Sequence, residues 1–438
     1  MSISTVSHVA LILLKLTSCC VCYNILVYNP QVGHSHAGFW SSVADHLVEA
    51  GHNVVSYILR KGKQHFSIHT VYSPAYNEDV KPTGAKLATV LSRPRQKNLY
   101  LNLTSLAGLF WTASGMNIVQ MKEVILLPFY QINDVNIINT LNRTTYDVGV
   151  TELISSCGFV IIEKLNIQNY VSGFATNLME MTTAPFQFEN VPSYVPATMT
   201  HLDEEMSFSE RLFNFGTLIG SRVLMELFVN SKLSYEELVP NFRLQEKIAH
   251  STYVFINSDI HLEFPRPLDP RIIHLGSIGV RDPKPLSQDF ALMLDGFNGP
   301  VVVIAFGSVV QSCDMPNDIL NAFLGTFSNF PEVLFLWKYE KNSSLANGMT
   351  NVVKRNWLPL NDLFAHEKVR LFVSHCGLNS LVETSSAAVP MLCIPLYGDQ
   401  MRNAKIAKNL GIAHVLDKTK ISIAALSKAL RELLFNSK

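Results

Sequence analysis

The stretch FVSHCGLNSLVETSSAAVPMLCIPLYGDQMRNA, residues 372–404, decides the fold. A short apolar run ends in a polar turn, and a segment from about Leu378 to Ala388 follows with helical spacing. Pro390 closes this helix, and a second apolar run, Met391–Pro395, leads to another polar turn. Strand, helix, strand and second helix in this order predict a parallel sheet with helices on its faces.

Polar side chains cluster where each of these predicted strands ends. In an open α/β sheet the carboxyl ends of the strands form the ligand crevice. A helix N-terminus with free N–H groups beside His375 is an anion site, most naturally for phosphate. Glu383 lies four residues after Asn379 on one helix face, and a carboxylate there suits the paired hydroxyls of a ribose. A ligand with phosphate and many hydroxyls is therefore predicted, held by His375, Gly377, Asn379, Ser380, Glu383, Asp399 and Gln400.

These residues resemble the signature of the UDP-glycosyltransferase family, which includes the animal UDP-glucuronosyltransferases and the nematode enzymes like them. The resemblance extends over nearly the whole chain, from about Asn24 to Lys438. It assigns separate residues to the diphosphate, the ribose and the sugar of a UDP-sugar donor. The implied roles are diphosphate binding by His375, Asn379 and Ser380, ribose binding by Glu383, and sugar binding by Asp399 and Gln400.

The chain departs from the family pattern at two positions. The family usually has two glycines after the histidine, whereas here Cys376 precedes Gly377. We expect its Cβ to crowd the turn or the diphosphate, because glycine is used where backbone meets ligand closely. By the resemblance Trp357 stacks on uracil, with core packing as the alternative role. Leu360 stands where a glutamine is usual and cannot hydrogen-bond a base.

Two α/β series follow one another along the chain. The first opens with a predicted strand at Tyr23–Asn29, a helix at Ala37–Ala50 and a strand at Asn53–Leu59, which is a βαβ unit. A proline-rich stretch, Phe264–Pro285, is the predicted linker, and a second series opens with the strand Val301–Phe306. We predict an α/β protein with two doubly wound, Rossmann-like domains facing a cleft, the GT-B fold that the resemblance also implies. The predicted divisions are a signal peptide at 1–22, an acceptor-binding domain at 23–263, a linker at 264–285 and a UDP-sugar-binding domain at 286–438.

Further elements are predicted inside the first domain. Gln31–His36 is expected to be a loop, and the pattern weakens from about Arg60 to Asn142, where helices and loops are expected around a substrate pocket. The remaining predictions are strands at Tyr146–Thr151 and Tyr253–Asn257 and helices at Ser156–Leu165, Phe208–Asn230 and Tyr235–Ala249.

A histidine follows the first predicted strand, in the sequence Gly33-His-Ser-His36-Ala37. Gly-x-Ser-x-Ala is close to the nucleophile elbow of serine hydrolases, but that elbow normally follows several earlier strands. In a glycosyltransferase His36 would be the general base for an acceptor hydroxyl, because its ordinary pKa lies near working pH. A helix-capping or core role is the alternative.

A base of this kind needs an orienting carboxylate. The resemblance points to Glu152, at the end of the strand Tyr146–Thr151. A helix N-cap or a surface charge is the alternative role for Glu152. Asp147 is the rival carboxylate, but it lies at the start of the strand and is expected at its wrong end.

Charge and motifs exclude several classes of protein. Lys plus Arg and Asp plus Glu each number 35, so the formal net charge is zero and no basic field for nucleic acid exists. The chain has no Asp-x-Asp pair, so no metal is predicted; helix N-termini and His375 would stabilise the leaving diphosphate. By the resemblance Ser308 also reaches the diphosphate, with a plain turn serine as the alternative. The cysteine spacing fits neither a zinc site nor a disulfide framework.

The two ends of the chain bear on its location. An apolar run, Val9–Leu14, indicates a short signal peptide cleaved near Cys20–Cys22, with a buried strand or a ragged gene start as alternatives. Sequons at Asn102, Asn142 and Asn342 agree with entry to the secretory pathway. Family members continue with a helix and a membrane span, so we expect a C-terminally truncated protein without a span. The expected location is the endoplasmic reticulum, luminal or membrane-associated, or outside the cell.

The predicted function is inverting transfer of glucuronic acid or glucose from a UDP-sugar to a hydroxyl of a small lipophilic acceptor. The UDP-sugar is a co-substrate, and no cofactor is predicted. The alternative is a weakened or inactive relative that binds lipophilic ligands, which Cys376, Leu360 and the C-terminus favour. The predicted partners are the UDP-sugar and the acceptor, without nucleic acid; self-association is left open.

Overall fold

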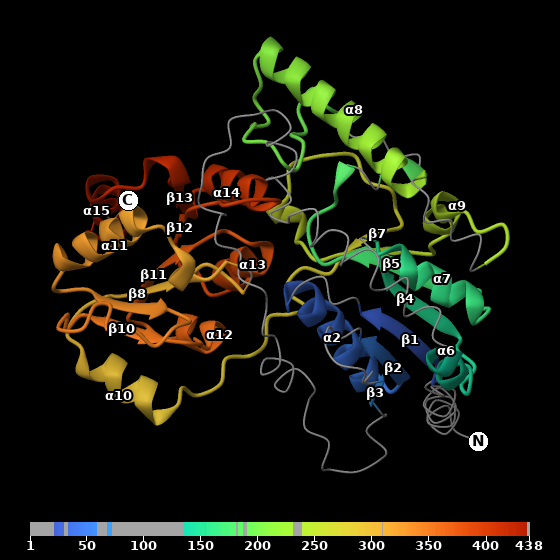
Figure 1. Ribbon diagram of the computed structural model, residues 1–438, viewed down its shortest axis with the longest axis horizontal. Coiled ribbons are helices and arrows are strands. Elements are labelled where there is room, and N and C mark those ends of the chain that lie inside the picture. Colours follow the sequence, from blue (N-terminus) through green and yellow to red (C-terminus); the bar gives the residue numbers. More distant parts are fainter. Residues whose placement is uncertain are drawn as a thin grey trace, which may run out of the picture.

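Two α/β units lie side by side in the computed structural model (Figure 1). We call residues 22–274 the first unit and residues 288–435 the second unit. Each unit is built on one sheet, and the second unit carries helices on both sheet faces. The structure describes residues 22–29, 34–58, 68–71, 135–153, 155–180, 183–186, 191–230, 239–308 and 310–435.

The sheet of the first unit has seven strands in the order β3-β2-β1-β4-β5-β6-β7. Neighbouring strands are parallel except β2 and β3, which are antiparallel. Because β4 pairs directly with β1, residues far apart in the sequence end at the same edge of the sheet. The strands are β1 (Asn24–Asn29), β2 (Asn53–Ile58), β3 (Ile68–Val71), β4 (Val148–Glu152), β5 (Tyr170–Phe174), β6 (Val254–Ile256) and β7 (Ile272–His274).

Strand β1 is buried on both faces, which explains its unbroken apolar run. Ile25 and Val27 pack with helix α2, and Leu26 and Tyr28 pack in the cluster that contains helix α7. Successive side chains of a strand point to opposite faces, so each helix covers one face. The helices of this unit are α2 (His34–Glu49), α6 (Val135–Leu141), α7 (Ser156–Lys164), η2 (Ala184–Phe186), α8 (Phe208–Asn230), α9 (Leu244–Ala249) and η4 (Ile260–Leu262).

The sheet of the second unit has six parallel strands in the order β10-β9-β8-β11-β12-β13. Separate apolar clusters cover its two faces. The strands are β8 (Val301–Ala305), β9 (Leu334–Lys338), β10 (Val352–Arg355), β11 (Val369–Ser374), β12 (Met391–Cys393) and β13 (Ala413–Val415). The helices are α10 (Gln288–Gly296), η5 (Ser312–Asp314), α11 (Asn317–Ser328), α12 (Leu360–Phe364), α13 (Leu378–Ser386), α14 (Gln400–Asn409), η6 (Lys418–Lys420) and α15 (Ile423–Phe435).

The structure confirms the predicted α/β architecture and corrects three of its details. His34–His36, expected in a loop, form the first turn of α2. Tyr235–Ala249 was expected to be one helix, but of its described part only Leu244–Ala249 is helical. The predicted linker Phe264–Pro285 contains strand β7, which completes the first sheet by pairing with β6. A three-residue strand between prolines carries too little periodic signal to be recognised.

Some predictions fall on segments outside the described residues. These are the signal peptide up to residue 21, the sequon at Asn102 and most of the stretch 60–142. Within the described part of the chain, no helix is both long enough and apolar enough to cross a membrane.

Candidate active site

His36 and Glu152 meet at the carboxyl edge of the first sheet. His36 lies in the first turn of α2, and Glu152 is the last residue of β4. His36 Nδ1 lies 3.1 Å from Glu152 Oε2, and their side chains are 12% and 0% exposed. Trp40 Nε1 donates a second hydrogen bond to Oε2 at 2.5 Å, and the Ala175 N–H donates to Oε1 at 3.4 Å. The carboxylate is therefore held in one orientation by three groups.

The charge of Glu152 controls the basicity of His36. Burial by itself would lower the pKa of His36, but the charge and hydrogen bond of Glu152 and the charge of Asp399 outweigh it. The pKa of His36 is therefore raised above its ordinary 6.5. With Nδ1–H donated to the carboxylate, the lone pair is on Nε2, which is the atom that can accept a proton.

The two competing interpretations of this region fit less well. Ser35 of the elbow-like sequence is exposed in the first turn of α2, and the histidine that meets a carboxylate is His36. The rival Asp147 accepts the backbone N–H of Asn24 at 2.8 Å, at the far end of β4 from Glu152. Of the two carboxylates, Glu152 is the one that contacts His36.

The second unit places His375 in a turn between β11 and α13. The His375 ring occupies the space that a side chain would need at two glycines. A Cβ added at Gly307 would lie 2.8 Å from the ring, and one added at Gly377 would lie 2.7 Å from it. Burial, and then the charge of Lys338, lower the pKa of His375 to about 4. At neutral pH this histidine is therefore an uncharged hydrogen-bond donor.

Lys338 is a residue that the sequence analysis missed. It is the last residue of β9 and is buried, although it is charged. Its Nζ donates to the Gly307 carbonyl at 2.5 Å, lies 3.4 Å from Glu340 Oε1 and lies 5.7 Å from the centre of the Trp357 ring. A lysine that ends an apolar strand, in the sequence LFLWK, was the available signal. It places a cation beside the predicted base and diphosphate subsites.

Lys338 Nζ lies near the Trp357 ring and bonds the carbonyl of Gly307, the residue before Ser308. Trp357 is 53% exposed, so its ring is available for stacking rather than packed in the core. Ser308 follows Gly307 in the turn after β8. Leu360 begins α12 and packs against the core cluster of the second unit. The structure thus gives Leu360 a packing role, which explains an apolar residue at that position.

Helix α13 presents three of the predicted donor-binding side chains. Asn379 Oδ1 accepts a hydrogen bond from Asn257 Nδ2 of the first unit at 2.8 Å. Ser380 lies beside it in the first turn and is buried. Glu383 is partly buried, and its removal from water raises its pKa to about 7. A carboxyl group with that pKa is held ready to lose its proton when hydroxyl donors approach.

Asp399 and Gln400 stand at the start of α14. Asp399 accepts a hydrogen bond from Asn403 Nδ2 at 2.8 Å, and burial raises its pKa. Gln400 Oε1 accepts the backbone N–H groups of Leu396 and Tyr397, at 2.8 and 3.1 Å. The Gln400 oxygen therefore shapes the turn before α14, and only its amide nitrogen can serve a sugar hydroxyl.

The structure corrects the expectation for the cysteines. Cys376 and Cys393 form a disulfide with Cα atoms 5.4 Å apart, although their spacing did not indicate one. Cys376 has a φ of 58°, in the region that favours glycine, and its side chain is fully buried in the core beneath the turn. The expectation that its Cβ crowds the turn or the diphosphate stays a prediction. Among the described residues, no three His, Cys, Asp or Glu side chains gather as a metal site would require.

Comparisons with known proteins show the family of this chain. The family profile described as "UDP-glucoronosyl and UDP-glucosyl transferase" matches residues 24–438. The chain is 28% identical to the putative UDP-glucuronosyltransferase ugt-55 of Caenorhabditis elegans over 96% of its own length and 81% of that protein. It is 30% identical to UDP-glucuronosyltransferase 1-2 of Mus musculus, over 68% of this chain and 56% of that one.

Solved structures show the same architecture. UGT2 of Phytolacca americana, complexed with UDP-2fluoro-glucose and pterostilbene, superposes with a TM-score of 0.60 at 16% identity, covering 95% of this chain and 91% of that one. A UDP-glucosyltransferase from Polygonum tinctorium superposes with a TM-score of 0.61 at 15% identity, covering 96% and 91%. The fold is GT-B, as predicted. The protein is a glycosyltransferase of this fold, and the chain belongs to the UDP-glucoronosyl and UDP-glucosyl transferase family.

Proposed function

We propose that the protein transfers glucose or glucuronic acid from a UDP-sugar to a hydroxyl of a small lipophilic acceptor, with inversion at the anomeric carbon. The observation that carries the proposal is the His36–Glu152 pair, whose basicity is also set by Asp399 of the opposite unit. A base on one unit thus interacts electrostatically with a predicted sugar-binding residue on the other.

The proposed reaction is a single displacement. Nε2 of His36 takes the proton of the acceptor hydroxyl, and the acceptor oxygen attacks the anomeric carbon. The bond from that carbon to the diphosphate breaks, and UDP leaves with the electron pair. Attack from the face opposite the leaving group inverts the configuration. Glu152 stabilises the imidazolium that forms on His36.

Several groups of the second unit are suited to the developing charge on UDP. The first turn of α13 follows Gly377 and directs backbone N–H groups at the diphosphate subsite. Neutral His375 contributes one N–H, and Lys338 contributes a positive charge close to the turn at Gly307. Trp357 offers a flat surface to uracil, and Glu383 offers its carboxylate to the ribose.

The relatives support the class of substrate. Both relatives named above carry the name UDP-glucuronosyltransferase, and the Phytolacca americana enzyme was solved with UDP-2fluoro-glucose and pterostilbene. We further propose a compartment of the secretory pathway, such as the endoplasmic reticulum lumen. The Cys376–Cys393 disulfide supports this proposal, because disulfides persist in oxidising compartments.

A donor screen tests the proposed function. The purified chain is incubated with UDP-glucose or UDP-glucuronic acid and a phenolic acceptor, and products are identified by mass spectrometry and by NMR of the anomeric proton. We expect a β-linked product from an α-linked donor. Tight UDP binding in calorimetry without any product would instead favour a ligand-binding relative, and a retained α-linkage would contradict the single displacement.

A further inference from the structure

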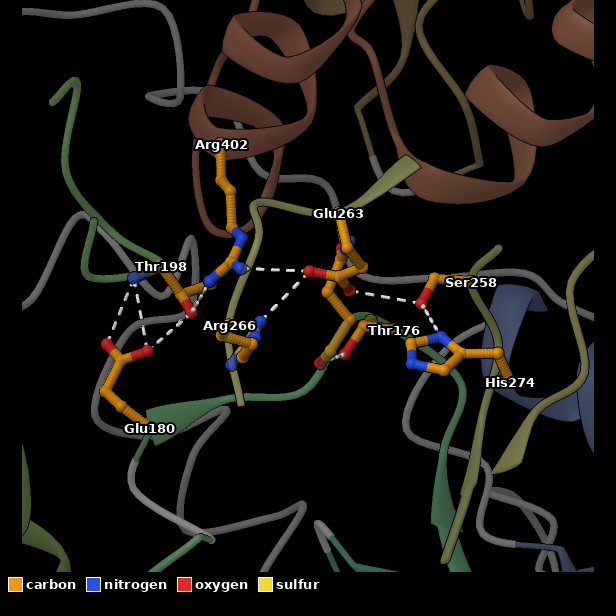
Figure 2. A network of polar contacts seen from close by, with 9 residues as sticks. Thr176, Glu180, Thr198, Ser258, Glu263, Arg266, His274 and Arg402 are labelled. Carbon is orange, nitrogen blue, oxygen red and sulfur yellow. Dashed lines mark hydrogen bonds and ion pairs between the residues drawn. The ribbon is translucent and has the colours of Figure 1, made fainter. Parts of the chain in front are cut away.

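A buried ion-pair network joins the first turn of α14 to the first unit (Figure 2). Arg402, on α14, is 1% exposed, and its Nη2 lies 2.9 Å from Glu263 Oε2. Glu263 Oε2 also lies 2.9 Å from Nη2 of Arg266, and Glu263 Oε1 accepts a hydrogen bond from Ser258 Oγ at 3.1 Å. Arg402 thus comes from the second unit, whereas the other residues named in this cluster belong to the first unit.

The network continues on the other side of Arg402. Arg402 Nη1 lies 3.5 Å from Thr198 Oγ1, and Thr198 donates its hydroxyl to Glu180 Oε2 at 2.6 Å (Figure 2). The Thr198 N–H also donates to Glu180 Oε1 at 3.0 Å. The two carboxylates of Glu180 and Glu263 balance the two guanidinium groups of Arg402 and Arg266. Burial lowers the pKa of Arg402 to about 10, so it remains a cation at neutral pH.

Arg402 lies three residues after Asp399, the residue before α14 whose charge acts on His36. The neighbouring Asn403 donates to Asp399 Oδ2 at 2.8 Å and to the Cys376 carbonyl at 3.1 Å. One turn of helix therefore ties the predicted sugar subsite to the first unit through Arg402 and to the diphosphate turn through Asn403.

We propose that Arg402 is a positioning residue, whose buried pair with Glu263 fixes the first turn of α14 against the first unit and so holds Asp399 opposite His36. The effects on kcat that this proposal predicts rest on the proposed sugar transfer. Apolar packing alone could join the units, and a buried ion pair is weak evidence for stability. A planar guanidinium that binds partners on two sides does fix the orientation of the helix turn that carries it. A base on one unit and a sugar on the other need such a fixed relative orientation in order to react.

A second pair on α14 provides a matched control. Lys405 Nζ lies 3.0 Å from Asp203 Oδ2 of the first unit, and these side chains are 24% and 30% exposed. This pair joins the same helix to the same unit, three residues farther from Asp399. Because both side chains are partly exposed to water, the loss of this pair should affect the geometry less than the loss of the buried pair.

The test compares Arg402→Met, Arg402→Lys, Glu263→Gln and Lys405→Met in the full chain. We expect Arg402→Met to lower kcat about 10- to 100-fold, the scale of a small misplacement of reacting groups, with UDP affinity in calorimetry unchanged. Arg402→Lys should recover part of kcat. Arg402→Met combined with Glu263→Gln should cost no more than Arg402→Met alone, because coupled residues are not additive. Lys405→Met should retain the wild-type kcat.

Hydrogen–deuterium exchange of residues 396–403 gives a readout that does not depend on activity. We expect faster exchange there in Arg402→Met than in Lys405→Met. If wild-type protein transfers no sugar, the proposed function fails while this exchange difference still tests the positioning role. Equal exchange in the two variants, an unchanged kcat in Arg402→Met and Arg402→Lys, or an equal loss of kcat in Lys405→Met would each overturn the proposal.

Discussion

Nδ1 of His36 lies 3.1 Å from Oε2 of Glu152, although 116 residues separate them in the sequence. The pairing follows from topology, because β4 pairs with β1 and its end comes beside the start of α2. Trp40 and Ala175 hold the same carboxylate, so its orientation does not depend on His36 alone. The histidine consequently has a fixed direction and a raised pKa before any substrate binds.

Replacing Glu152 by Gln tests whether its charge raises the pKa of His36. The base works unprotonated, so kcat/KM falls as pH drops through the His36 pKa, which lies above 6.5 in the wild type. Without the carboxylate this pKa falls, and we expect the acid limb of the pH profile to move to lower pH. Asp147→Asn, at the far end of β4, is the control and should leave the limb in place. If the acid limb stayed at the same pH in Glu152→Gln, this would contradict the assignment of Glu152 as the group that raises the pKa of His36.

Glu383 predicts a proton release on UDP binding. Its pKa of about 7 means that it is partly protonated near neutral pH, and ribose hydroxyls that donate to it would favour the ionised form. Calorimetry at pH 7 in buffers of different ionisation enthalpy measures the protons released. We expect Glu383→Gln to release fewer protons than the wild type and to bind UDP about 10-fold more weakly. Equal proton release by the two proteins would show that Glu383 does not bind the ribose.

The Cys376–Cys393 disulfide predicts a redox dependence of stability. The two residues are 17 apart in the sequence, and closing a loop of that size stabilises a fold by about 3 kcal/mol in the chain-entropy description. We expect dithiothreitol to lower the melting temperature of the wild type and to leave that of Cys393→Ala unchanged. Cys313→Ala, which removes a free cysteine, should respond as the wild type does. If dithiothreitol left the melting temperature of the wild type unchanged under unfolding conditions, this would argue against the Cys376–Cys393 disulfide.

Activity in EDTA tests the proposed source of leaving-group stabilisation. If Lys338, His375 and the first turn of α13 meet the charge on UDP, sugar transfer needs no divalent ion. We expect the same turnover with EDTA as with added Mg²⁺ or Mn²⁺. Turnover that appears only after either ion is added would show that another charge is required.

The sequence predicted the fold because most elements carry strong local signals. The buried strands β1, β8 and β11 are continuous apolar runs, and α2 repeats apolar residues at helical spacing. Strand β7 was missed because three residues between prolines carry no such signal. The candidate donor-binding residues from His375 to Gln400 could be grouped from the sequence because they follow one another in a single strand–helix–strand–helix segment.

The remaining features of the site depend on contacts between distant residues. Trp40 lies on the apolar face of α2, and nothing local reveals that its Nε1 donates to Glu152. Cysteine spacing does not reveal that Cys376 and Cys393 meet. From the sequence alone, Arg402 would be expected to be a surface charge on a polar helix. Only the packing of α14 against the first unit makes it a buried partner of Glu263.

The most direct test of the account is the turnover of His36→Ala beside its affinity for UDP. We expect kcat to fall about 10²- to 10⁴-fold, which is the usual contribution of a general base, with an unchanged UDP dissociation constant. His46→Ala is the control, because His46 lies on the same helix and hydrogen-bonds the Ser42 carbonyl at 2.8 Å. Near-wild-type turnover of His36→Ala, or an equal loss in His46→Ala, would contradict the assignment of His36 as the base.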